Sequence, residues 1–284
     1  MEAATKGTVA SFGPRLITGV VLAICAVAAV GVGGLAFLTV VGVLTAVVAF
    51  EWIRMSCRAR SNGSLILSVV AVTASAASFA GWGAVGALLV GAAGVALVGA
   101  ASRMERNKPI LTMSGLALFL LSLISICWLR QENSVGMATV YWLFAVVWAT
   151  DSGAYFLGSL IGGAKIATRI SPKKTWSGAI GGLVFGILIG VVSAVILESA
   201  GVLKASTHLV TVSIAGAIVS LLAQTGDFAE SAVKRHFAVK DSGSWLPGHG
   251  GALDRLDSLI FVSPFLALAV WLAGGSTALL WGGG

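Results

Sequence analysis

The chain has 284 residues, of which 57% are hydrophobic and only 10% are charged, and its formal net charge is +7. Soluble domains carry about 25% charged residues, so this composition excludes an ordinary soluble protein and indicates a polytopic membrane protein. The three cysteines lie in or beside apolar runs and give neither a disulfide framework nor the spacing of a metal site.

About nine apolar runs of membrane-spanning length follow one another along the chain. They predict an all-α polytopic integral membrane protein with about nine transmembrane helices in a single transmembrane domain, 1–284. The first run is longer than the core of a signal peptide and no cleavage site stands out, so we interpret it as a retained helix. The predicted spans are 14–33, 34–52, 64–82, 83–102, 110–129, 138–161, 178–197, 208–227 and 256–275.

Basic residues are distributed unevenly between the loops that these spans define. With the N-terminus in the cytoplasm, the outer segments hold only Arg130 and Lys204 of the 18 lysines and arginines. This asymmetry follows the positive-inside rule and places the polar segments 148–177 and 224–258 on the cytoplasmic side. A basic face attracts anionic lipid headgroups and nucleotide phosphates. Nucleic acid is not an expected partner, because the basic residues lie in short loops.

The first of these polar segments contains a carboxylate within an apolar run and a lysine pair after it. An unpaired charge at the position of Asp151 is costly, so we expect this residue to face a polar cavity, a cation or a basic partner. A purely structural ion pair with a lysine is the alternative. Lys173 and Lys174 follow a Ser-Pro pair, and their position alone is equally compatible with charges that flank the next span.

The stretch 224–257 holds the densest group of ionisable residues in the chain. Four of its polar residues have the spacing of a single helix face, and a glycine-rich turn at 246–251 lets backbone approach a ligand. Carboxylates that flank basic residues and such a turn suit a polyphosphate with a divalent cation. A solvated loop with ion pairs is the alternative, but clustering against so apolar a background favours a functional site. The four residues are Asp227, Glu230, Ser231 and Lys234.

The fixed spacing in this stretch resembles the signature of the phosphatidate cytidylyltransferases, also called CDP-diacylglycerol synthases. The segments around Asp151 and at 171–176 resemble the same family. The chain departs from the family pattern at Ser177, where a carboxylate is usual, and near Ser159, where an arginine is common. The signature residues here are Ser231, Lys234, Arg235, Lys240, Asp241, the run Pro247-Gly248-His249-Gly250-Gly251, Asp254, Arg255 and Asp257.

The resemblance implies transfer of a cytidylyl group from CTP to phosphatidate, which gives CDP-diacylglycerol and pyrophosphate in phospholipid biosynthesis. An anionic oxygen of the lipid phosphate would attack the α-phosphorus of CTP in line, assisted by Mg²⁺ as one ion or two. We expect Asp227 and Asp254 to be the metal ligands. The expected catalytic residues are Asp227, Asp254, Lys234, Arg235, Lys240, Asp241 and Asp257. The expected substrate-binding residues are Asp151, Ser171, Lys173, Lys174, Thr175, Ser231, His249, Gly250, Gly251 and Arg255.

Two other functions are alternatives: a related membrane lipid kinase and a cation-coupled secondary transporter. A transporter could use Asp151 and Asp227 as cation or proton sites, but it would not need a charged loop with a glycine turn. A CDP-alcohol phosphotransferase is disfavoured because its Asp-Gly-x-x-Ala-Arg run is absent. The expected partners are CTP, phosphatidate and membrane lipid, with a homodimer as an option. The expected location is the bacterial inner membrane.

Overall fold

The computed structural model describes residues 19–57, 62–131, 133–203, 208–243 and 250–281. These contain seven helices that are long and apolar enough to cross a membrane, and a shorter apolar helix, Gly19–Val32, precedes them. The fold is therefore the all-α integral membrane protein that the composition predicts. The elements are α2 (Gly34–Ser56), α3 (Asn62–Met104), α4 (Pro109–Arg130), α5 (Asn133–Ile161), α6 (Trp176–Ser199), α7 (Leu209–His236), α8 (Leu253–Leu272) and the 3-10 helix η1 (Thr277–Trp281).

One continuous element contains two of the predicted spans. The backbone of α3 leaves the helical region at Gly83, with φ 66° and ψ −160°, a conformation that glycine adopts without strain. The two arms fold back on each other, since the Ser75 hydroxyl donates a hydrogen bond to the Ala87 carbonyl at 2.9 Å. The spans predicted at 64–82 and 83–102 are thus the two arms of a helical hairpin.

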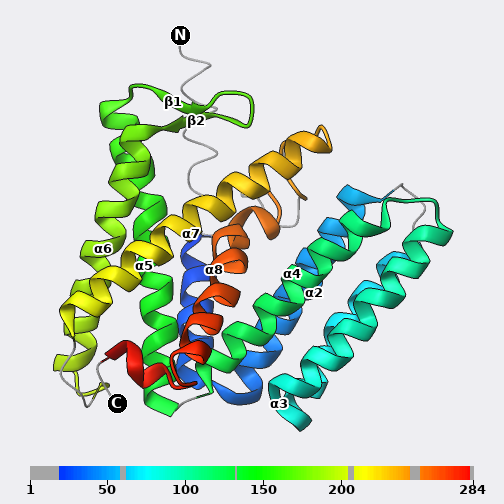
Figure 1. Cartoon of the computed structure of the whole chain (residues 1–284), viewed down its shortest axis with the longest axis horizontal. Coiled ribbons are helices and arrows are strands. Elements are labelled where there is room, and N and C mark those ends of the chain that lie inside the picture. The colour runs from blue at the N-terminus through cyan, green and yellow to red at the C-terminus, as the bar shows by residue number, and fades with distance from the viewer. Residues whose placement is uncertain (1–18, 58–61, 132, 204–207, 244–249, 282–284) are drawn as a thin grey trace.

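Close helix packing places α5 next to α6 and α7. A glycine stripe on α6 faces α5, and a Cβ on Gly186 would lie only 2.6 Å from the Thr150 hydroxyl. Such small-residue faces allow helix backbones to approach closely in lipid. In Figure 1, α5 and α6 stand at one edge of the molecule and α3 at the other, α8 lies between them, and α7 runs diagonally from the α5–α6 edge past α8.

A short β-hairpin projects from the end of α5. Its strands, β1 (Lys165–Ala167) and β2 (Ser171–Thr175), pair antiparallel. Thr175 ends the hairpin and caps α6, because its hydroxyl accepts a hydrogen bond from the Gly178 amide at 3.1 Å. The hairpin lies at the same end of the molecule as the C-terminus of α7 and the N-terminus of α8 (Figure 1).

Candidate active site

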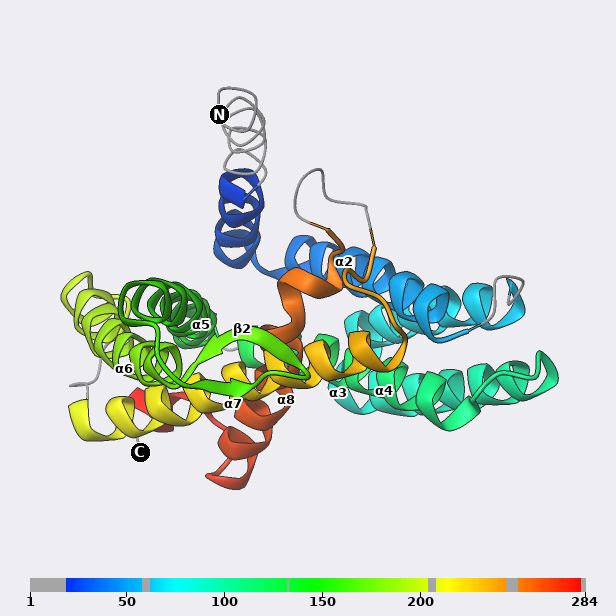
Figure 2. The same ribbon diagram turned by 90° about the horizontal axis from the view of Figure 1, so that it is seen from above.

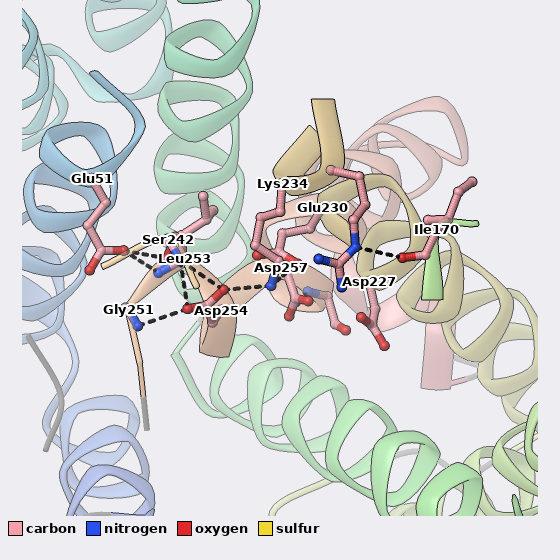
Figure 3. Close-up of polar contacts among 12 residues, drawn as sticks. Glu51, Ile170, Asp227, Glu230, Lys234, Ser242, Gly251, Leu253, Asp254 and Asp257 are labelled. Atoms are coloured by element: carbon pink, nitrogen blue, oxygen red, sulfur yellow. Dashed lines mark hydrogen bonds and ion pairs between the residues drawn. The ribbon is translucent and has the colours of Figure 1, made fainter. Parts of the chain in front are cut away.

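The charged residues predicted from the sequence gather where α7 ends, α8 begins and β2 passes. Viewed from above, β2 lies over α7 (Figure 2), and the polar contacts of the site run between α7, α8 and the segment before α8 (Figure 3). The predicted span ended at residue 227, but α7 continues to His236. This extension brings Asp227, Glu230 and Lys234 into one helical segment with the spacing of a common face.

Three carboxylates converge at the centre of the site. Asp227, Glu230 and Asp257 offer oxygens that all lie within 4.8 Å of one another. The Glu230 Oε1 atom is buried and has no hydrogen-bond partner among the described residues. Like charges so close repel unless a cation lies between them, and Mg²⁺ prefers carboxylate oxygens of this kind. The three residues therefore fit a divalent cation.

A lysine links this carboxylate group to the glycine turn. The Nζ atom of Lys234 lies 2.7 Å from Glu230 Oε2 and 2.7 Å from Asp254 Oδ1. Asp254 also accepts hydrogen bonds from the Gly251 amide at 2.8 Å and the Ser242 amide at 3.0 Å. Protein donors thus surround Asp254, whereas Asp227 belongs to the three converging carboxylates, which we call the convergent group. The metal-binding role of both residues stays a prediction.

The β-hairpin adds basic residues from above. Lys174 Nζ lies 2.6 Å from Asp227 Oδ2 and 4.0 Å from the centre of the Phe228 ring. Its neighbour Lys173 is exposed, as expected from the alternation of side chains along a strand. The Arg235 guanidinium donates a hydrogen bond to the Ile170 carbonyl at 3.3 Å. The hairpin is therefore joined to α7 at two points.

Asp151 stands on α5 beside this group. It interacts electrostatically with Lys174 and Arg255, and also with the like-charged Asp227. A basic partner is one of the three surroundings that its position in an apolar run predicts. Whether Asp151 contacts substrate stays a prediction.

The remaining predicted residues differ in exposure. Lys240, Asp241 and Arg255 are exposed, whereas Ser171 and Ser231 are half-buried. Gly250 has φ 80°, in the region that favours glycine. His249 lies outside the described residues, together with Pro247 and Gly248.

The two departures from the family signature have local partners. The Ser177 hydroxyl donates a hydrogen bond to the Gly162 carbonyl at 2.5 Å, and Ser159 donates to the Phe156 carbonyl at 2.9 Å. Both serines thus bond to backbone next to the hairpin.

Sequence reasoning missed one carboxylate that borders the site. Glu51, near the end of α2, is only 1% exposed. It accepts hydrogen bonds from the Ser242 hydroxyl and from the amides of Ala252 and Leu253, each at 2.9 Å (Figure 3). The signal was present, since Glu51 is an ionisable residue within an apolar run, as Asp151 is.

An apolar cavity of about 490 Å³ reaches the first turn of α8. Its walls come from the helix Gly19–Val32, α2, α4, α5 and α8, with Phe119 and Trp148 among the aromatic lining residues. Arg255 is the one charged residue among the described residues that line it. The apolar cavity therefore reaches the helical turn that also carries Asp254 and Asp257.

Comparison with known proteins shows the family to which the chain belongs. The sequence model described as "Cytidylyltransferase family" matches residues 13–273. The phosphatidate cytidylyltransferase of Bacillus subtilis (strain 168) is 32% identical over 262 residues, which cover 89% of this chain and 95% of that protein.

Other relatives match a shorter stretch of the chain at higher sequence identity. The phosphatidate cytidylyltransferase of Brucella suis biovar 1 (strain 1330) is 45% identical over 147 residues, or 52% of each chain. That of Staphylococcus saprophyticus is 42% identical over 143 residues, which cover 50% of this chain and 53% of the relative. In these matches the chain spans about half the length of the curated relatives. Together with the match over 13–273, the Bacillus comparison shows that the chain belongs to the cytidylyltransferase family.

Proposed function

We propose that the chain transfers the cytidylyl group of CTP to phosphatidate, giving CDP-diacylglycerol and pyrophosphate. Membership of the cytidylyltransferase family and the similarity to phosphatidate cytidylyltransferases of several bacteria support this function. The observation that carries it is the convergence of Asp227, Glu230 and Asp257, with Lys174 and Lys234 beside them. Such an arrangement suits two polyanionic substrates that must meet.

The chemistry needs little more than orientation and charge compensation. A phosphate oxygen of phosphatidate is anionic near neutral pH, so it attacks the α-phosphorus of CTP without giving up a proton. A bond forms between this oxygen and the α-phosphorus, the bond from the α-phosphorus to the bridging oxygen breaks, and pyrophosphate leaves. Lys174 on β2 and Arg235 on α7 would offset the charge of the two substrates.

A divalent cation belongs to this proposal. Asp227, Glu230 and Asp257 are the residues that would hold it, and its charge would neutralise phosphate oxygens of the nucleotide. The buried, unpartnered Oε1 atom of Glu230 supports this assignment. Lys234 limits the negative charge of the group by pairing with Glu230 and Asp254.

We also propose that the site faces the cytoplasm at the bacterial inner membrane. The uneven distribution of lysine and arginine supports this orientation. The lipid's acyl chains would enter from the bilayer, and the apolar cavity beside Arg255 is large enough to accept part of them. The phosphate of the lipid would then lie at the charged end of that cavity.

Labelled nucleotides test the proposal directly. Purified full-length protein is incubated with phosphatidate, Mg²⁺ and either α-labelled CTP, γ-labelled CTP or γ-labelled ATP. We expect label in the lipid only from α-labelled CTP, with one pyrophosphate released for each labelled lipid. Transfer of a γ-phosphate into lipid would instead identify a lipid kinase and overturn the proposal.

A further inference from the structure

Glu51 connects α2 to the two backbone segments that flank the glycine turn. Its Oε2 atom accepts hydrogen bonds from the Ser242 hydroxyl and the Leu253 amide, and its Oε1 atom accepts one from the Ala252 amide. About 200 residues of sequence separate Glu51 from Leu253, so this contact is made only in the folded chain. The carboxylate is almost completely shielded from water, at 1% exposure.

This contact caps a helix that has no cap of its own. The N-cap residue of α8, Ala252, has no side chain that can accept a hydrogen bond. The first amides of a helix lack partners within it, and a negative charge beside them is favourable. Glu51 supplies both the acceptors and the charge from α2. The first turn of α8, which carries Asp254 and Asp257, is thereby fixed in place.

The packing around the carboxylate is tight. A Cβ on Gly251 would lie 2.6 Å from Glu51 Oε2 and would overlap the Ser242 hydroxyl. A Cβ on Gly243 would overlap Glu51 Oε1. The backbones at Gly243 and Gly251 therefore pack directly against the Glu51 side chain, and a small movement of that side chain must also move these two segments.

We propose that Glu51 is a positioning residue for cytidylyl transfer, an inference that rests on the proposed function. Glu51 holds the Ser242 and Gly251 segments that donate their amides to Asp254. Asp254 in turn pairs with Lys234, which pairs with Glu230 of the convergent group. Among the described residues, Glu51 accepts its hydrogen bonds from Ser242, Ala252 and Leu253, and it acts by keeping the start of α8 in register with α7.

The chain contains a matched control for this test. Glu105 accepts hydrogen bonds from the amides of Gly63 and Ser64 and from the Ser64 hydroxyl. It therefore caps the start of α3 with two amides and one serine hydroxyl, as Glu51 does for α8, and it also accepts a hydrogen bond from the Asn107 side chain at 3.4 Å. The helical hairpin α3, which Glu105 caps, packs on α2 and α4 at the edge of the molecule away from the β-hairpin (Figure 1).

The experiment compares Glu51→Gln, Glu51→Asp and Glu105→Gln in the full-length protein. Glutamine keeps the size of the side chain, but its amide group places a donor against a donor, so at least one of the three bonds is lost. We expect kcat in Glu51→Gln to fall about tenfold to a hundredfold, since displacing reacting groups by about 1 Å can cost that much. The Mg²⁺ concentration for half-maximal rate should rise, and Glu51→Asp should recover part of kcat.

Glu105→Gln should lower the apparent melting temperature while kcat and the Mg²⁺ dependence stay at wild-type values. Wild-type kinetics in Glu51→Gln would overturn the inference, as would an equal loss of kcat in Glu105→Gln. If Glu51→Gln does not fold, Ser242→Ala is tested instead, because it removes one of the three bonds. We then expect a smaller fall of kcat and a smaller rise of the Mg²⁺ concentration for half-maximal rate. Unchanged kinetics there would also overturn the inference. An inactive wild-type protein would refute the proposed function instead.

Discussion

Replacing Lys234 with methionine removes the cation that holds Glu230 and Asp254 together. Methionine keeps the approximate length of the side chain, so the change removes charge more than volume. The Lys234 side chain is 15% exposed, and those of its two partners are 7% and 8% exposed. The substitution therefore leaves two largely buried carboxylates close together without their shared partner.

The burial of these side chains sets the expected loss of folding stability in Lys234→Met. Removing one partner of a buried ion pair costs about 3–5 kcal/mol, and we expect about 3 kcal/mol because water still reaches part of Lys234. Lys174→Met is the matched comparison, since its pair with Asp227 has side chains that are 22% and 38% exposed. The Lys174 Nζ atom is buried, but water reaches the more exposed Asp227 side chain, so we expect a smaller loss of stability than for Lys234.

Thermal unfolding in detergent, followed by circular dichroism, measures the order of stability. Wild type and Lys174→Met should melt at the highest temperatures and Lys234→Met at the lowest. Adding Glu230→Gln to Lys234→Met should recover part of the loss, because one of the two carboxylates is then neutral. Equal melting temperatures for Lys234→Met and wild type would refute the view that Lys234 holds this part of the site.

Three further predictions concern the hairpin, the orientation and the glycine turn. Lys174→Met should raise KM for a substrate about tenfold to a hundredfold, as for loss of a charge-assisted contact, and Lys173→Met should have a smaller effect. Wild-type KM values in both variants would support the alternative that these lysines only flank the next membrane span. In a cysteine-free background, Arg169→Cys and Ser199→Cys should react with an impermeant thiol reagent from opposite sides of the membrane, and labelling from one side would contradict the orientation. Gly251→Ala should abolish turnover because its Cβ has no room, and a wild-type rate would show that the turn is placed differently.

Local patterns were sufficient to predict much of the architecture and part of the site. Hydropathy marks the apolar runs, and the kink at Gly83 does not obscure them because each arm of α3 has membrane length. Helical spacing predicted that Asp227, Glu230 and Lys234 belong together, and the structure shows an ion pair between Glu230 and Lys234. These features depend on residues a few positions apart, which the sequence displays directly.

The rest depends on contacts between distant segments. Hydropathy ended the eighth predicted span at residue 227 because charged residues begin there, although α7 continues as a helix to His236. The pairing of Lys174 with Asp227 follows from where the hairpin docks, which spacing cannot reveal. The contacts of Glu51 follow from the packing of α2 against the start of α8.

The Mg²⁺ dependence of cytidylyl transfer tests most directly whether the convergent carboxylates hold the metal. Rates are measured over a range of Mg²⁺ concentrations for wild type, Asp227→Asn, Asp257→Asn and Asp254→Asn. A shifted Mg²⁺ dependence in Asp254→Asn would show that Asp254 is also a metal ligand. Asparagine keeps the shape of each side chain and removes the charge that binds a cation. We predict that Asp227→Asn and Asp257→Asn lower turnover by about two orders of magnitude or more and raise the Mg²⁺ concentration for half-maximal rate. Near-normal turnover with an unshifted Mg²⁺ dependence in both variants would contradict the assignment.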